Sequence, residues 1–200
     1  MTSHKSGQTA NASDRVDIRL EQVRMIYAAM PLSLAAVVVN GGLLGIVLWG
    51  TVPDANIVIW LSVTYVISIG RWITYRRFER HSGQTQRDPA WQHLALAAAW
   101  VSGAVWGSTA IFLFPIHSLP HQLFLAFVLA GMSAGAVTTL SAVFSMVAGF
   151  LCLVLLPVIV RFVSLDTAMA SAMALMATLF AGMIVLSALR LNRTILESLQ

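Results

Sequence analysis

Long apolar runs alternate with short polar and charged stretches along almost the whole chain. Residues 25–50 contain no charged side chain, residues 57–75 contain only Arg71, and residues 94–114 again contain none. A helix needs about 20 residues to cross the hydrocarbon core of a bilayer, at a rise of about 1.5 Å per residue. Each run is long enough, so we predict three membrane-spanning helices. Arg71 lies close enough to the end of its run for the guanidinium to reach the lipid headgroups.

The segment 122–160 is too long for one span. Its 39 residues include no acidic, basic or histidine side chain, and as a single helix it would extend roughly 58 Å, about twice the hydrocarbon thickness. We therefore predict a helical hairpin that turns among the hydroxyl side chains between Thr138 and Ser145. The resulting spans are 122–141, 144–163 and, after a further polar break, 167–189.

The composition agrees with a protein embedded in lipid. Of the 200 residues, 58% are hydrophobic and only 10% are charged, whereas about 25% are charged in soluble domains. The single cysteine, Cys152, excludes an intrachain disulfide and a cysteine-rich metal site. We predict an all-α integral membrane bundle of six transmembrane helices, surrounded by the lipid bilayer and without a cofactor.

The basic residues predict the orientation of the bundle. If both termini face the cytoplasm, eleven of the twelve Lys and Arg residues lie on that side, and only Arg161 lies outside. Short cytoplasmic loops of membrane proteins are enriched in Lys and Arg. We therefore expect a multi-pass protein of a bacterial inner membrane with cytoplasmic N- and C-termini. The net charge of +4 follows from this topology, so no nucleic acid partner is expected.

The predicted organisation has three parts. Residues 1–24 begin with a polar tail that we expect to be disordered. They continue into an amphipathic lead-in helix, because apolar residues recur at helical spacing from Val16 to Tyr27. Residues 25–190 form the transmembrane domain, and residues 191–200 begin a cytoplasmic signalling helix.

Small residues recur four apart in three of the predicted spans. This spacing places both residues on one face of a helix, where a neighbouring helix can approach closely. We expect this packing to occur within the chain rather than across a dimer. The residues assigned to helix packing are Gly41, Gly45, Gly103, Gly107, Gly131, Ser133 and Gly135.

Residues 131–135 also read G-x-S-x-G, the pattern around the nucleophile of many serine hydrolases. Ser133 would need a base within hydrogen-bond reach, but it lies in the middle of a span and no predicted span contains a histidine. His117 and His121 lie near the outer end of the same helix, with Pro120 between them and no third ligand nearby. They therefore predict neither a base nor a metal site, and no catalytic residue is assigned.

Asn40 is the only amide side chain deep within a predicted span. Two roles are open for it, contact with a ligand or a hydrogen bond to a neighbouring helix. The spans contain no Asp or Glu, although transporters commonly carry such groups for coupling.

The last span continues into LRLNRTILESLQ without a helix breaker. Its leucines have spacing typical of a coiled-coil seam, with an asparagine in the intervening position. We expect a homodimer to form through this C-terminal helix. The residues assigned to the exit helix are Leu189, Asn192, Leu196 and Leu199.

Two stretches carry a resemblance to a known family: HQLFLAFVLAGMSAGAVTTLSAV after an FPIHSLP loop, and the tail LNRTILESLQ. They resemble the N-terminal six-helix membrane region of bacterial hybrid sensor histidine kinases and of related diguanylate cyclase and phosphodiesterase proteins. The resemblance implies an input module that passes its state through the last helix to a cytoplasmic enzyme, usually as a dimer.

The sequence therefore predicts a membrane-embedded sensory input module of a signal-transduction protein of the histidine kinase type. The 200 residues contain no H-box, nucleotide-binding motif or cyclase signature, so we expect no enzyme activity in them and an output domain downstream. Two alternatives remain open. The module could serve a cyclic-di-GMP cyclase or phosphodiesterase, or the chain could be a small stand-alone transporter.

Overall fold

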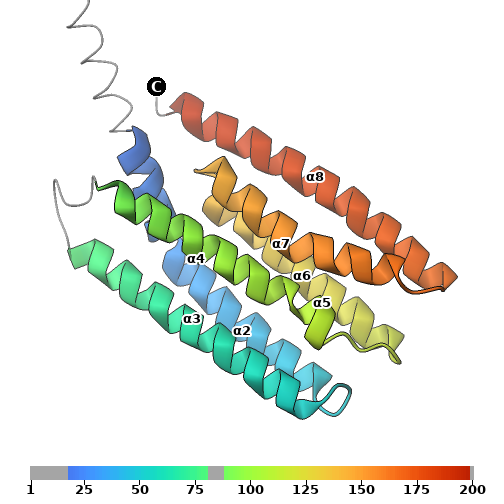
Figure 1. Ribbon diagram of the computed structural model, residues 1–200. Helices are drawn as coiled ribbons and strands as arrows, with labels where there is room; N and C mark the ends of the chain where they lie inside the picture. The colour runs from blue at the N-terminus through green and yellow to red at the C-terminus, as the bar shows by residue number, and fades with distance from the viewer. Residues whose placement is uncertain (1–17, 81–87, 199–200) are drawn as a thin grey trace, which may run out of the picture.

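The computed structural model describes residues 18–80 and 88–198, which are helical and contain no strand. Six helices in this part of the chain are long and apolar enough to cross a membrane, so the predicted six-span all-α fold is confirmed. The spans are Ile18–Leu48, Asp54–Arg80, Pro89–Phe112, Leu119–Leu140, Phe144–Val163 and Ala168–Ser198. In Figure 1 they correspond to α2 (Met30–Leu48, the second part of the first span), α3 (Asp54–Arg80), α4 (Pro89–Gly107) with α5 (Thr109–Phe112), α6 (Leu119–Leu140), α7 (Phe144–Val163) and α8 (Ala168–Ser198).

Consecutive spans run in opposite directions, so the first described span begins at the same end of the bundle at which the last one ends (Figure 1). Helix α7 contacts α4, α6 and α8, while α2 contacts α3 and α6. Helix α8 lies against α7 and α6 on the outside of the bundle. The helical hairpin predicted for residues 122–160 is present, because α6 ends at Leu140 and α7 begins at Phe144.

The first span differs from its predicted form. It begins within the expected lead-in helix, at Ile18, and Val23 and Tyr27 are buried inside the protein. The ring of Tyr27 stacks on Phe78 of α3, with the ring centroids 4.1 Å apart. Pro31 has no N–H to donate to the carbonyl one turn earlier, which accounts for the short break before α2. The apolar face of the lead-in therefore packs on protein.

A short turn joins α2 to α3. Gly50 has a φ of 72°, a conformation that glycine adopts at little cost and other residues rarely adopt. The N–H of Gly50 donates to Oδ1 of Asp54 at 3.0 Å. The carboxylate of Asp54, the first residue of α3, thus accepts a hydrogen bond from a backbone N–H of the turn.

Glycines of α4 allow a close approach of α4 to α7. A Cβ atom added at Gly103 would lie 3.1 Å from the Cα of Phe150, and one added at Gly107 would overlap the carbonyl oxygen of Leu153. Both contacts are with the backbone of α7. The intrachain packing expected of these two glycines therefore takes place against α7.

The same interface contains a glycine that sequence reasoning did not single out. A Cβ added at Gly149 of α7 would overlap the indole of Trp100, whose Nε1 donates to the carbonyl of Ser145 at 3.1 Å. On the other side of the bundle, an added Cβ would lie 2.8 Å from Cδ1 of Leu61 at Gly45 and 3.8 Å from its Cδ2 at Gly41. The first two spans thus also pack closely, with the glycines of α2 against a leucine of α3.

The glycines of α6 do not form the expected packing notch. Nothing lies within 4 Å of a Cβ added at Gly131 or Gly135, and both residues are exposed, whereas Ser133 is fully buried. Successive residues are about 100° apart around a helix, so positions two apart point to nearly opposite sides. The residues of G-x-S-x-G therefore could not share one contact face.

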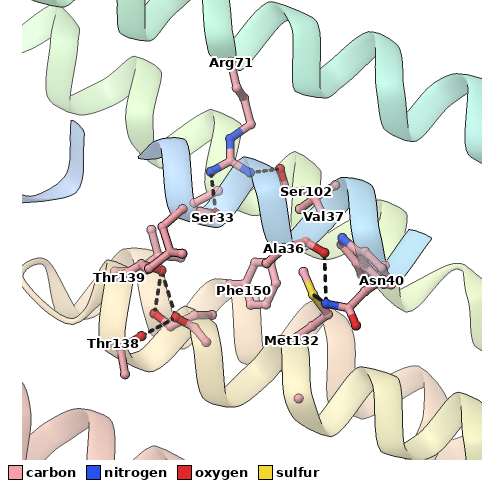
Figure 2. Close-up of a pocket in the computed structure, with 17 residues that line it drawn as sticks. Ser33, Ala36, Val37, Asn40, Arg71, Ser102, Met132, Thr138, Thr139 and Phe150 are labelled. Carbon is pink, nitrogen blue, oxygen red and sulfur yellow. Dashed lines mark hydrogen bonds between the residues drawn. The ribbon is translucent and has the colours of Figure 1, made fainter. Parts of the chain in front are cut away.

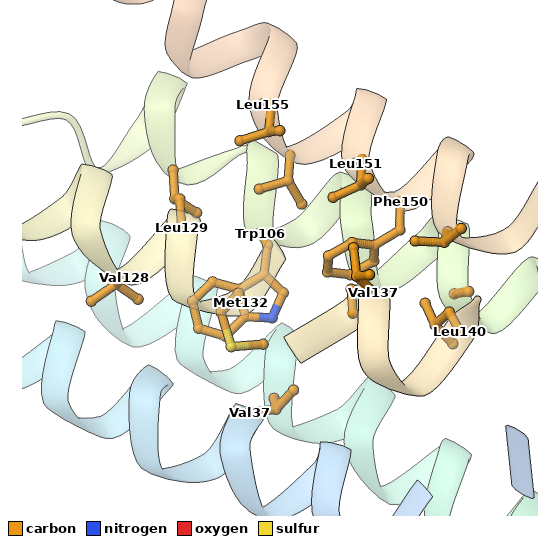
Figure 3. Close-up of a cluster of buried hydrophobic side chains, with 14 of the residues drawn as sticks. Val37, Trp106, Val128, Leu129, Met132, Val137, Leu140, Phe150, Leu151 and Leu155 are labelled. Atoms are coloured by element: carbon orange, nitrogen blue, oxygen red, sulfur yellow. The ribbon is translucent and has the colours of Figure 1, made fainter. Parts of the chain in front are cut away.

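The buried side of α6 carries the apolar core. Leu129, Met132 and Val137 of α6 point toward Trp106 of α4 and Leu151 of α7 (Figure 3). Trp106 is only 1% exposed. This cluster lies between α4, α6 and α7. One side of α6 therefore packs against these helices, and the side that carries Gly131 and Gly135 faces away from the cluster.

Alanine substitution should separate the two classes of glycine. We expect Gly107→Ala to destabilise the bundle by about 1–3 kcal/mol, because the methyl group must push α4 away from the α7 backbone. Gly131→Ala should be neutral or slightly stabilising, since alanine favours a helix by about 0.5–1 kcal/mol over glycine. Thermal unfolding of the purified protein in detergent would measure both, and equal tolerance would contradict the assignment.

Candidate functional site

A pocket of about 120 Å³ lies inside the bundle between α2 and α6, with three residues from α4 and one each from α3 and α7. Figure 2 shows Arg71 reaching from α3 toward Ser33 of α2, with Thr138 and Thr139 across the pocket on α6. The seventeen lining residues are Leu32, Ser33, Ala36, Val37, Asn40, Arg71, Ala99, Ser102, Trp106, Gly131, Met132, Gly135, Ala136, Thr138, Thr139, Leu140 and Phe150.

Arg71 turns into the bundle instead of toward the lipid headgroups, in contrast to the prediction. One terminal nitrogen donates to Oγ of Ser102 at 3.2 Å, and the other donates to Oγ of Ser33 at 3.4 Å. Its Nε is buried without a hydrogen-bond partner among the described residues. A guanidinium carries five N–H donors, so Arg71 has donors left over within the pocket.

The charge of Arg71 has no carboxylate partner among the described residues. All eight acidic residues of the chain lie at or beyond the ends of the spans. The nearest one along α3 is Glu79, eight residues away, or about 12 Å of helix rise. Its Oε1 accepts the hydroxyl of Tyr75 at 2.6 Å. A cation without a partner in a low-dielectric environment creates a strong positive potential.

The hydroxyl groups of the pocket are acceptors toward any ligand. Thr138 and Thr139 donate their hydroxyl hydrogens to the carbonyl of Gly135 at 2.8 and 3.0 Å, and Ser102 donates to Ala98 at 2.8 Å. Since each hydroxyl has only one hydrogen, these three hydroxyls have none left for a ligand. The available donors therefore come mainly from Arg71.

Asn40 contacts a neighbouring helix, one of the two roles that the sequence left open, while the ligand role stays a prediction. Its Nδ2 donates to the carbonyl of Ala36 at 2.9 Å and contacts Sδ of Met132 on α6 at 3.6 Å. The same side chain also lines the pocket. Asn40 thus links α2 to α6 at the pocket wall.

Gly131 and Gly135 line the pocket on α6, so the absence of their side chains leaves space there. Thr138 on the same helix is exposed, and Leu32 on α2 is 73% exposed. These exposed positions mark the side on which the pocket reaches the outer surface of the bundle, between α2 and α6. A side chain at either glycine would project into open space.

Asn192 of the exit helix is placed against the bundle. Its Nδ2 donates to the carbonyls of Ser141 and Ala142, at 2.7 and 3.2 Å. Gln22 of the first span donates to the same Ala142 carbonyl at 2.6 Å. The turn between α6 and α7 therefore connects the first and last spans.

The other exit-helix residues have less defined positions. Leu189 and Leu196 are half-buried, and Leu199 lies outside the described residues. Sequence reasoning placed Asn192 in a coiled-coil slot and did not foresee its contact with residues 141 and 142. It also overlooked Gln22, for which the spacing pattern carries no signal.

Ser133 and His121, the candidates for a nucleophile and for a base or metal ligand, have hydrogen-bond partners close by in the sequence or in a neighbouring loop. Oγ of Ser133 donates to the carbonyl of Leu129 at 2.8 Å within α6. The ring nitrogens of His121 lie within hydrogen-bond distance of Ser118 and Thr51. The described residues contain no group of three or more His, Cys, Asp or Glu side chains that could hold a metal ion.

Comparisons of the chain with protein-family models, with curated proteins and with solved structures found no match. The membrane fold and the pocket are therefore argued from this structure alone. The resemblance to sensor membrane regions stays a prediction.

Replacement of Arg71 should reveal whether its charge supports the fold. A charge inside a span costs about 2.5–3.5 kcal/mol on insertion scales, and apolar residues of similar volume commonly replace buried charges at no loss. We expect Arg71→Met to leave the free energy of unfolding unchanged within about 1 kcal/mol or to raise it. Arg76→Met, on the exposed side of α3, is the control. A loss of about 3 kcal/mol or more in thermal or denaturant unfolding would make Arg71 a structural anchor.

Proposed function

We propose that the chain is the membrane-embedded sensory input module of a signal-transduction protein. In this proposal a change inside the bundle moves the last helix and is passed to a cytoplasmic output domain. The observation that carries it is the hydrogen bonding of Asn192 to the turn between α6 and α7. The six-span fold is compatible with such a module.

The pocket and the exit helix are linked through one short segment. Thr138, Thr139 and Leu140 line the pocket and form the last turn of α6. The next residues are Ser141 and Ala142, whose carbonyls accept from Asn192. A displacement of the last turn of α6 must therefore either move α8 or break these bonds. Leaving a buried polar group unpaired costs about 1–3 kcal/mol.

Helix α8 is suited to movement because little of it is buried. Its buried residues are three alanines, Ala170, Ala174 and Ala188, and it contacts α6 and α7 on one side only. Met183 and Leu186 are 70% and 57% exposed. The exposed side could contact lipid or the same helix of a second copy, which supports the proposed homodimer.

A chimeric kinase tests the proposal. A dimeric histidine kinase core is joined after Gln200, and autophosphorylation is measured in vesicles. We expect Asn192→Leu to change output about fivefold or more, the usual lower range of coupling between sites. Thr194→Val, which alters an exposed hydroxyl bonded within its own helix, should leave output unchanged.

Two outcomes would count against the proposal. An output that Asn192→Leu leaves unchanged would contradict the proposed coupling, because this variant removes the donor of both bonds. Solute flux across vesicles containing the unfused chain would favour the transporter alternative. A cyclase core in place of the kinase core would show whether the exit helix can drive a cyclic-di-GMP enzyme.

The proposed cytoplasmic orientation rests on the basic residues. Arg76, Arg77 and Arg193 lie at the end of the bundle that also holds the two described chain ends, whereas Arg161 lies near the opposite end. This distribution fits a cytoplasmic location for the end rich in arginine.

Cysteine labelling measures the orientation directly. In a Cys152→Ala background, an impermeant maleimide should label Asp166→Cys on intact spheroplasts. Ser198→Cys should be labelled only after lysis, because we place that end of the helix in the cytoplasm. Both positions are exposed, and the reverse pattern would invert the topology.

A further inference from the structure

We infer that the pocket between α2 and α6 binds a carboxylate or phosphate group that a single-chain amphiphile brings in from the bilayer, with Arg71 as its receptor. That such a ligand is the stimulus rests on the proposed function. The binding itself does not depend on it.

The positive charge of Arg71 favours an anionic ligand. Arg71 reaches into the pocket with a buried, unpartnered Nε and no carboxylate partner among the described residues. Its two bonds to serine hydroxyls, at 3.2 and 3.4 Å, are long and go to uncharged acceptors. A planar oxyanion could accept two parallel N–H bonds from the guanidinium, the strongest arrangement open to arginine.

The size of the pocket limits how much of a ligand can enter it. Its volume is about 120 Å³, close to the roughly 150 Å³ cavity that holds one benzene molecule in an engineered protein. Drug-sized ligands occupy about 300–1,000 Å³. The pocket therefore has room for a headgroup and a few carbon atoms, while the rest of a longer chain would lie outside.

Polar side chains are unevenly distributed along the pocket. Ser33, Arg71 and Thr139 lie toward one end of the pocket, whereas Met132 lies toward the other end, where Asn40 is the polar residue (Figure 2). Gly131 and Thr139 are eight positions apart, which corresponds to about 12 Å along the helix. An amphiphile lying along α6 with its anionic group toward Arg71 would match this arrangement.

Access from the lipid also fits the geometry. Gly131 and Gly135 form an α6 wall without side chains, and Leu32 lies exposed on α2 opposite to it. A chain that leaves the pocket between these helices enters the hydrocarbon region directly. Within the described part of the chain, the pocket thus contains the guanidinium of Arg71 and opens sideways between α2 and α6.

The experiment uses the purified full chain in phosphatidylcholine nanodiscs with a diazirine-labelled palmitic acid. Cross-links should map to residues 131–139 of α6 and to residues 32–40 of α2. We expect Arg71→Gln to weaken binding about tenfold or more, since it removes charge-assisted hydrogen bonds. Arg76→Gln removes the same charge from the exposed side of α3 and should leave binding within about twofold.

A second pair of variants keeps Arg71 in place. Gly135→Leu should fill the pocket and abolish cross-linking, while a folded protein is retained because the added side chain meets open space. Ala134→Leu, at the neighbouring exposed position, should bind normally. This pair tests the site even if Arg71→Gln does not fold.

Competitors distinguish the chemistry and the source of the anion. Unlabelled palmitate and palmitoyl lysophosphatidic acid should compete, and hexadecanol should not. If acetate or inorganic phosphate competes as well as palmitate, the anion site stands but the bilayer route is overturned.

Two results would overturn the inference as a whole. One is equal binding of palmitate and hexadecanol. The other is binding that survives both Arg71→Gln and Gly135→Leu. Anion binding that leaves the output of the chimeric kinase unchanged would contradict only the role of the anion as the stimulus.

Discussion

The arrangement of the bundle depends on the direct contact between the backbones of α4 and α7. Lipid tails are as apolar as the side chains, so helices associate in a bilayer through close packing and not through a hydrophobic force. Gly103 and Gly107 permit that packing because a Cβ at either position would meet the α7 backbone. With α7 fixed against α4, its remaining sides receive α6 and α8. The outer position of α8 follows from this order.

The pocket results from how α6 meets this arrangement. Large side chains of α6 such as Leu129 pack against α4 and α7, and Met132 also contacts Asn40 of α2. Gly131 and Gly135 have no side chain to place beside α2, which leaves a hollow there. Arg71 enters the hollow from α3, where serines of α2 and α4 accept its hydrogen bonds. One helix thus provides both core and cavity.

Hydrophobic patterning could predict the spans because the length of each apolar run is a property of the chain alone. The turn near residues 141–143 could be predicted for the same reason, since a single 39-residue helix would not fit a bilayer. The direction in which a side chain points depends on its neighbours. Arg71 was predicted to reach the headgroups, because the serines that accept its bonds lie 38 and 31 residues away in sequence.

The same limit applies to the motif in α6 and to the exit helix. G-x-S-x-G and G-x-x-x-G are one-dimensional patterns, whereas the 100° step of a helix puts Ser133 and the two glycines on different sides. Asn192 fits a coiled-coil position by spacing, but the structure offers it two carbonyls of a turn about fifty residues away. Only the packing of α8 on α6 and α7 brings these groups together.

A small displacement in this bundle can carry a useful amount of free energy. At an effective dielectric constant of about 20, two unit charges attract by about 4 kcal/mol at 4 Å and by about 2.8 kcal/mol at 6 Å. A 2 Å change in the distance between Arg71 and a bound anion thus corresponds to about 1.4 kcal/mol, or roughly a tenfold change in population. A ligand shifts an equilibrium only by its difference in affinity for the two states. In the proposed module, Arg71 would supply such a difference, because it lines the same pocket as the last turn of α6 and the turn bonded to Asn192 follows directly.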